Sequence, residues 1–181
     1  MANQEKVCFE KVGSSLSAMT TLAFGINHKS ASVDVLKKIT FAPEIVVQAL
    51  QDARSILHVQ EIALLSTCNR TELYLHGDVT DTQLLTWLAM VKGVEIGQIK
   101  SCYYCYRGEE AVTHMMRVAS GLDSLILGEP QIFGQIKSAY AVGQEAGTVS
   151  TVLNQVFQQV FSAAKRVRSE TAIGKNPVSV A

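Results

Sequence analysis

The stretch from 62 to 75 restricts the fold of this chain more than any other. An apolar run, Ile62 to Leu65, stops at the polar segment 66–72, and a second strand-like run, Leu73 to Leu75, follows at once. The polar segment is too hydrophilic for a core strand, and it lacks the Pro and Gly of an ordinary turn. We therefore expect strands over 61–66 and 72–76 that place polar groups at one end of a sheet, where functional side chains often lie.

Hydrophobic periodicity predicts the remaining elements of the first half. Alternating Leu22, Phe24 and Ile26 predict a strand over 21–27, and the spacing of apolar residues elsewhere predicts helices. The further expected elements are a short helix over 33–39, a helix from Pro43 to Leu57, a helix from Asp81 to Val91 with Trp87 at the edge of its apolar stripe, and a strand over 101–106. This order predicts an α+β, ferredoxin-like split βαββαβ antiparallel sheet with two helices on one face.

The pattern changes after Gly108 to that of helices. Three helices are expected, and together they would form a helical annex to the sheet. They cover 109–120, 131–146 and 150–170. The expected parts of the chain are a disordered extension (1–18), an α+β part that carries Cys68 (19–107), a helical part (108–174), and the start of a connection to a further domain (175–181).

Composition limits the class of protein. Of 181 residues, 48% are hydrophobic and 18% are charged, so a sizeable core is expected. The formal net charge is zero, which neither supports nor excludes an RNA partner. There is no apolar segment typical of a signal peptide or a membrane span, so we expect a cytoplasmic protein with reduced thiols.

Two sets of cysteines are candidates for chemistry. Cys68 lies among polar residues and two positions from Arg70, and nearby positive charge favours the reactive thiolate; a buried, inert cysteine is the alternative. Cys102 and Cys105 have a spacing found in metal and redox sites, but no second such pair follows. We expect them to be packing residues, and we expect no metal site. Cys8 falls in the predicted extension.

Three motifs taken together resemble those of one enzyme family. They are Gly25-Ile26-Asn27-His28-Lys29, the heptapeptide from Ser66 to Glu72, and the segment from Ala119 to Ile132. In this order and spacing they are similar to glutamyl-tRNA reductase, the first enzyme of the five-carbon route to tetrapyrroles. The resemblance runs from about Met19 to the end. The chain departs from the family pattern at Ser32, where Pro is usual, and at Leu36-Lys37, where an Arg-Glu pair is usual.

The resemblance implies roles for particular residues. Cys68 is implied as the nucleophile, with His114 near it to favour the thiolate or to protonate the departing ribose oxygen. From the residues alone, His114 is as well explained as a structural histidine, and His28 as a turn cap. Arg70 is the expected partner of the substrate side-chain carboxylate, and Glu129 or Glu72 could accept its ammonium group. The full set implied to hold the glutamyl moiety is Thr67, Asn69, Arg70, Ser124, Glu129, Pro130, Gln131 and Gln135.

The resemblance also implies a reaction and its partners. The Cys68 thiolate attacks glutamyl-tRNA to form a glutamyl thioester, which NADPH reduces to glutamate-1-semialdehyde, an oxidoreductase step on the way to 5-aminolevulinate, porphyrins and heme. Because the chain contains no Gly-x-Gly, the NADPH-binding domain and the dimerisation helices are expected after Ala181. This part alone is expected to form or hydrolyse the thioester. The resemblance also implies that the full-length enzyme forms a homodimer and that glutamate-1-semialdehyde aminomutase is a partner.

Two other classes of function stay open at this stage. A non-redox cysteine acyl transferase or hydrolase would use Cys68 and His114 without a nucleotide domain. An RNA-binding module is the second alternative, because ferredoxin-like sheets often bind RNA through exposed aromatic residues. Tyr103, Tyr104 and Tyr106 could supply these. The basic residues of the last predicted helix could contact tRNA or complement the helix dipole; they are Lys165, Arg166 and Arg168.

Overall fold

A four-stranded antiparallel sheet lies at the centre of the computed structural model, which describes residues 21–174. The strands are β1 (Thr21–Asn27), β2 (Glu61–Ser66), β3 (Arg70–His76) and β4 (Tyr104–Arg107). Their order is β2-β3-β1-β4, so β1 pairs with β3 on one side and with β4 on the other. This is the ferredoxin-like arrangement, and the prediction of an α+β fold is confirmed.

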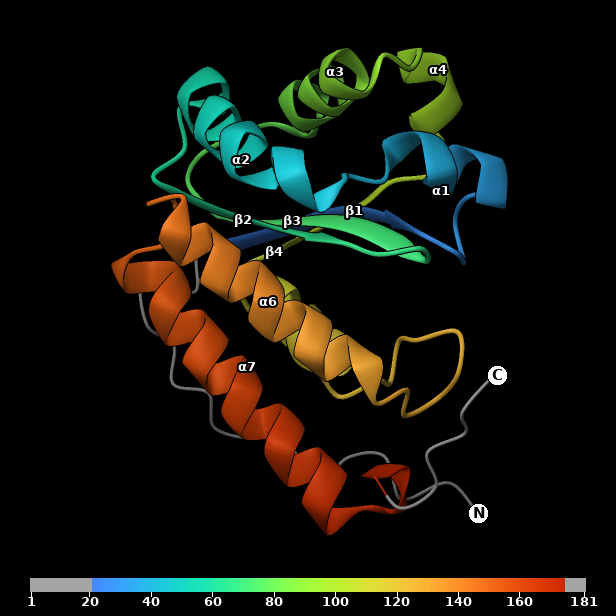
Figure 1. Cartoon of the computed structure of the whole chain (residues 1–181), viewed down its shortest axis with the longest axis vertical. Helices are drawn as coiled ribbons and strands as arrows, with labels where there is room; N and C mark the ends of the chain where they lie inside the picture. Colours follow the sequence, from blue (N-terminus) through green and yellow to red (C-terminus); the bar gives the residue numbers. More distant parts are fainter. Residues whose placement is uncertain (1–20, 175–181) are drawn as a thin grey trace.

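Four helices cover one face of the sheet (Figure 1). They are α1 (Val33–Ile39), α2 (Pro43–Leu57), α3 (Asp81–Lys92) and α4 (Ile96–Ile99). Alternate strand residues such as Leu22, Phe24 and Leu73 point to this face and join the helices in one hydrophobic core. Helix α4 was not predicted, because four residues are too few to show a helical period.

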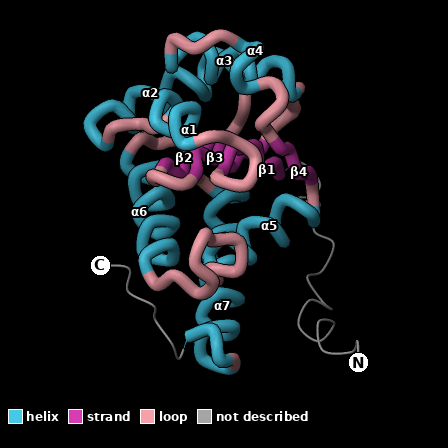
Figure 2. Tube along the Cα trace, turned by 90° about the vertical axis from the view of Figure 1, so that its right-hand side faces the viewer, coloured by secondary structure: helices cyan, strands magenta, loops and turns pink. Residues whose placement is uncertain are grey.

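The second face is covered by the helices that the sequence predicted as an annex. They are α5 (Glu109–Ala119), α6 (Gln131–Glu145) and α7 (Thr151–Glu170), with a short 3-10 turn, η1 (Ala172–Gly174), after them. Ala63, Leu65 and Tyr74 of the sheet share a core with these helices. Figures 1 and 2 both show the sheet between two helical layers, with α7 extending beyond it. The three strands β1, β2 and β3 are therefore buried on both faces, whereas the edge strand β4 is partly exposed.

Three details differ from the sequence prediction. Strand β3 begins at Arg70 rather than at 72, because Arg70 and Thr71 pair with Asn27 and Ile26 of β1. Strand β4 begins at Tyr104 rather than at 101, because the residues before it continue the turn that ends α4. Trp87, expected at the edge of the apolar stripe of α3, is 2% exposed and stacks on the ring of Phe41, which precedes α2.

Helix α7 is positioned by a residue from another element. The carboxylate of Glu61, at the start of β2, accepts hydrogen bonds from the N–H groups of Ser150, Val152 and Leu153 at 2.8 to 2.9 Å. Ser150 itself makes no side-chain cap. A negative group at a helix N-terminus satisfies free N–H groups and complements the helix dipole. Burial raises the pKa of Glu61, but these hydrogen bonds outweigh it and lower the pKa.

Some expectations fall on parts of the chain that are not described. The predicted extension over 1–18 with Cys8, and the predicted connection over 175–181, lie outside the described residues. Within 21–174, no helix combines the length and the apolar character that crossing a membrane requires.

Candidate active site

Cys68 lies in the tight turn that joins β2 to β3. The Thr67 N–H donates to the Arg70 carbonyl at 2.8 Å, so Cys68 and Asn69 form a two-residue hairpin loop. The Thr67 hydroxyl accepts from the N–H groups of Asn69 and Arg70, both at 3.2 Å. This hydroxyl satisfies backbone groups that would otherwise lack partners, which explains a turn without Gly or Pro. The turn leaves the Cys68 thiol exposed.

The exposed thiol opens onto a cleft of about 600 Å³. The cleft lies between the hairpin turn, α1 and the loop 121–130, and its size is in the range typical of small-molecule sites. The hairpin turn is bonded to the residue that follows β1, because the His28 N–H donates to the Asn69 carbonyl at 2.9 Å. The lining residues are His28, Ala31, Val33, Leu36, Lys37, Thr40, Cys68, Asn69 and Leu125.

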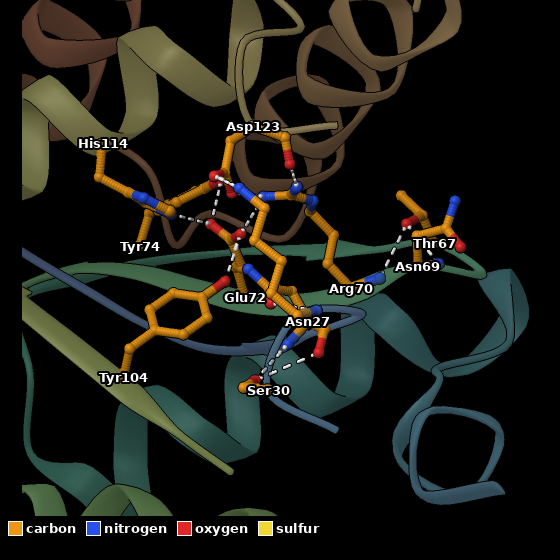
Figure 3. A network of polar contacts seen from close by, with 11 residues as sticks. Asn27, Ser30, Thr67, Asn69, Arg70, Glu72, Tyr74, Tyr104, His114 and Asp123 are labelled. Carbon is orange, nitrogen blue, oxygen red and sulfur yellow. Dashed lines mark hydrogen bonds and ion pairs between the residues drawn. The ribbon is translucent and has the colours of Figure 1, made fainter. Parts of the chain in front are cut away.

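A buried polar network lies directly behind the turn. Glu72 is fully buried, and Figure 3 shows its carboxylate surrounded by donors. One oxygen accepts from Arg70 and the Tyr104 hydroxyl, both at 2.6 Å. The other accepts from the Tyr74 hydroxyl at 2.7 Å and lies 2.9 Å from Nε2 of His114. Burial raises the pKa of Glu72, but these groups together lower it to about 2, so the carboxylate is charged at neutral pH.

Asp123 attaches the loop 121–130 to this network. The Arg70 guanidinium donates to an Asp123 side-chain oxygen at 3.2 Å and to its carbonyl at 2.5 Å. The Lys29 ammonium contacts the other carboxylate oxygen of Asp123 at 2.5 Å. Burial raises the pKa of Asp123, whereas the Lys29 hydrogen bond and the Arg70 charge lower it, and the net shift is downward. The loop is also closed by a bond from the Gly128 N–H to the Gly121 carbonyl at 2.9 Å.

The structure places the predicted substrate residues on two segments. One is the hairpin turn, and the other is the loop 121–130 with the first turns of α6. Asp123 links these segments directly through Arg70. The Ser124 hydroxyl is buried without a partner, and the Glu129 carbonyl accepts from Arg168 at 3.4 Å. On the turn are Thr67, Asn69 and Arg70; on the second segment are Ser124, Glu129, Pro130, Gln131 and Gln135.

Two predicted residues have surroundings that the sequence did not indicate. Arg70 was expected to bind the substrate carboxylate, but it is 2% exposed and its guanidinium is held by Glu72 and Asp123. His114 is also buried, lies against the rings of Tyr104 and Tyr106, and bonds to Glu72. His114 does not line the cleft of Cys68. The substrate and acid–base roles of these residues stay predictions.

Sequence reasoning missed Asp123 and left His28 undecided. The position of Asp123 directly before Ser124, within one of the three motifs, was a signal that could have marked it as a site residue. Its partners Lys29 and Arg70 could not be found in this way, because they are 94 and 53 residues away. His28 follows Asn27, whose side-chain oxygen accepts from the Lys29 N–H and shapes the turn. Only the pairing of β1 with β3 brings this turn beside Cys68.

The other candidates lie away from the cleft. Cys102 and Cys105 are free thiols, and burial followed by the Asp81 charge raises the pKa of Cys105 to about 12. Among residues 21–174, no three His, Cys, Asp or Glu side chains are grouped as metal ligands. In the basic cluster of α7, Arg166 pairs with Glu170 at the surface.

Comparisons with known proteins agree on one family. The family model described as the N-terminal domain of glutamyl-tRNAGlu reductase matches residues 24–171. The glutamyl-tRNA reductases of Saccharophagus degradans and Stutzerimonas stutzeri are 56% and 54% identical over 90% of this chain, which spans 38% and 39% of their lengths. The solved glutamyl-tRNA reductase of Methanopyrus kandleri is 34% identical with a TM-score of 0.73, over 89% of this chain and 37% of its own. The chain therefore belongs to the family of the glutamyl-tRNA reductase N-terminal domain.

Proposed function

We propose that this chain is the part of a glutamyl-tRNA reductase in which Cys68 captures the glutamyl group from glutamyl-tRNA. The observation that carries the proposal is the exposed Cys68 thiol at a hydrogen-bonded hairpin turn, open to a cleft of about 600 Å³. The loop that bounds the cleft through Leu125 also carries Ser124, one of the residues implied to hold the substrate. Family membership supports the identity of the substrate.

The proposed chemistry is an acyl transfer. The Cys68 sulfur forms a bond to the ester carbonyl carbon, and the bond from that carbon to the tRNA ribose oxygen breaks. The thiol proton ends on the ribose hydroxyl, and a glutamyl thioester remains on the protein. The exposed turn lets a macromolecular substrate approach, because its ester need enter only the cleft.

The buried network suggests how the site is kept rigid. Glu72 neutralises Arg70 and holds His114, while Asp123 ties the substrate loop to the same guanidinium. We assign His114 a positioning role that acts through Glu72. A substrate carboxylate reaches the Arg70 fork only by displacing Asp123, whereas the Lys29 side chain is 55% exposed beside it. Direct recognition by Arg70 therefore requires a movement of Asp123.

The proposal for the full-length protein includes reduction of the thioester to glutamate-1-semialdehyde by NADPH. The described residues do not fit a dinucleotide: their sheet is antiparallel throughout, and the chain has no Gly-x-Gly for a phosphate-binding turn after a parallel strand. We therefore assign no step of the reduction to this chain. A cytoplasmic homodimer that delivers its product to glutamate-1-semialdehyde aminomutase belongs to the same proposal, and sedimentation of the full-length protein tests its dimeric state.

The two alternative functions make different predictions. An RNA-binding module of this topology needs a free sheet face, but helices cover β1, β2 and β3 on both faces here, and Tyr104 is bonded to the buried Glu72. Of the three candidate tyrosines, Tyr106 on the edge strand β4 is the exposed one. A hydrolase shares the Cys68 nucleophile and differs in the fate of the thioester. The lifetime of the acyl group on Cys68 therefore separates a hydrolase from a reductase domain.

Mass spectrometry of the chain after mixing with glutamyl-tRNA tests the proposal. We expect a glutamyl adduct on Cys68 in the wild type and none in Cys68→Ser. The matched control is Cys102→Ser, which removes another free, partly accessible thiol and should be acylated like the wild type. No adduct in the wild type, or an equal adduct in Cys68→Ser, would refute the proposal.

A further inference from the structure

One buried nitrogen at the cleft has no explanation in the fold. Among residues 21–174, three buried side-chain atoms lack a hydrogen-bond partner, and they belong to His28, Trp87 and Ser124. Buried polar atoms are nearly always paired, so each exception needs a reason. Trp87 lies in the hydrophobic core beneath α1 to α4, whereas His28 lines the cleft and Ser124 directly precedes Leu125, which also lines it. The unpaired atom of His28 is its ring nitrogen Nδ1.

The backbone holds His28 beside the nucleophile. The His28 N–H donates to the carbonyl of Asn69, the residue that follows Cys68, at 2.9 Å. His28 and Cys68 line the same cleft. The bond continues the pairing of β1 with β3 past its last register pair, Asn27 with Arg70. The position of the imidazole relative to the turn is therefore set by the sheet rather than by a flexible loop.

The charges around His28 favour its neutral form. Burial is the largest cause that lowers the pKa of His28 below 6.5, and the charges of Arg70 and Lys29 lower it further. Asp123 acts in the opposite direction, and Lys37 and Cys68 are the other titratable groups that line the cleft. A neutral imidazole has one ring nitrogen that accepts a proton. His28 is thus ready to act as a base at neutral pH.

His114 is less suited to this role. Its Nε2 is engaged by the fully buried Glu72 at 2.9 Å, and its ring is packed against Tyr104 and Tyr106. Nε2 of His114 therefore faces a carboxylate that lies behind the turn, and His114 does not line the cleft. The two histidines differ in the one property that matters here, which is access to the space in front of the thiol.

We propose that His28 is the catalytic acid–base residue for acylation of Cys68, an inference that rests on the proposed function. The imidazole takes the proton from the Cys68 thiol as the sulfur bonds to the ester carbonyl carbon. When the bond from that carbon to the ribose oxygen breaks, the imidazolium gives the same proton to the oxygen. The products are the thioester and the free ribose hydroxyl, and no other reactant is needed.

Single-turnover acylation by glutamyl-tRNA, followed by intact mass, tests this role in His28→Asn and His28→Gln. The control is His58→Asn, since His58 is an exposed C-cap with φ of 53°, a conformation that Asn accepts, and it lies in a different pocket. General acid–base catalysis contributes about 10² to 10⁴ in rate. We expect acylation to be slowed at least about a hundredfold in both His28 variants and unchanged in the control.

The pH profile distinguishes a base from a structural residue. In the wild type, acylation should slow as the pH falls through the lowered pKa of His28, because the protonated ring cannot accept the thiol proton. This acidic limb should be absent from the residual rate of the His28 variants. The inference would be overturned, and the proposed function left intact, if the wild type is acylated and a His28 variant is acylated at a rate within twofold of it with the same pH profile. No acylation in the wild type would overturn both.

A measurement on the unsubstituted histidine covers variants that fail to fold. We expect the ¹⁵N resonances of the His28 ring to shift when Cys68 is alkylated with iodoacetamide, because the added group occupies the cleft that both residues line, and those of His58 to stay. Unchanged His28 resonances on alkylation would overturn the inference.

Discussion

Replacement of Glu61 by Gln should destabilise the protein through the N-terminus of α7. The carboxylate uses one oxygen for the N–H groups of Ser150 and Leu153 and the other for that of Val152. A glutamine side chain has a single acceptor oxygen. At least one of the three N–H groups therefore faces the amide NH₂ group instead of an acceptor. Glu61 is 3% exposed, so water cannot replace the lost acceptor.

The magnitude follows from two contributions. A hydrogen bond to a charged group is worth about 1.5–3 kcal/mol, and a charge at a helix N-terminus adds about 0.3–1 kcal/mol. The expected loss in the free energy of unfolding is therefore ~3 kcal/mol, which lowers Tm by roughly 6–12 °C for a chain of this size. Urea unfolding at pH 7 and thermal melting measure the two quantities.

The pH dependence gives an independent check. The folded-state pKa of Glu61 lies below its ordinary value of 4.5. Its contribution is therefore present above the unfolded pKa and is lost as the pH falls through the folded pKa. The difference between the wild type and Glu61→Gln should shrink on acidification. Equal stability of the two at pH 7, or an equal loss in the exposed control Glu145→Gln, would refute the reasoning.

Two further predictions concern the site. Glu72→Gln should lower the free energy of unfolding in urea by about 3–5 kcal/mol, because it breaks a buried ion pair with Arg70. Tyr104→Phe removes one of the four donors to Glu72 and should lower it by less than half as much. Similar losses in the two variants would contradict the central place of Glu72. Gly128→Ala should cost about 2 kcal/mol more than Gly147→Ala, because both have positive φ but a Cβ at Gly128 would lie 2.7 Å from the Ile173 carbonyl, whereas none lies within 4 Å at Gly147. Equal melting temperatures of the two glycine variants would show that η1 does not pack firmly on the loop 121–130.

The candidate site was predictable to different depths. The turn at Cys68 could be found from sequence because polar residues without Gly or Pro interrupt two apolar runs. The engagement of Arg70 could not, because alternation in β3 points it to the face where Glu72 and Asp123 meet it. The predicted ferredoxin-like topology already implies that β1 pairs with β3, but only the structure gives the hydrogen bond from His28 to Asn69 that places His28 beside Cys68.

The sequence by itself determined the features that depend on a few neighbouring residues. The start of α2 at Pro43, the capping box of Thr80 and Gln83 at α3, and the end of α3 at Gly93 are local effects of backbone geometry and hydrogen bonding. The order of elements and the ferredoxin-like topology followed from periodicity. These features need no knowledge of what lies across the core.

Only the tertiary structure decided the features that join distant residues. The packing of α5 to α7 on the second sheet face, the capping of α7 by Glu61, and the network around Glu72 all depend on contacts between segments far apart in the chain. The physical reason is that a buried carboxylate must find its donors wherever the fold places them, since an unpaired buried charge is too costly to keep. Local sequence patterns carry no record of those partners.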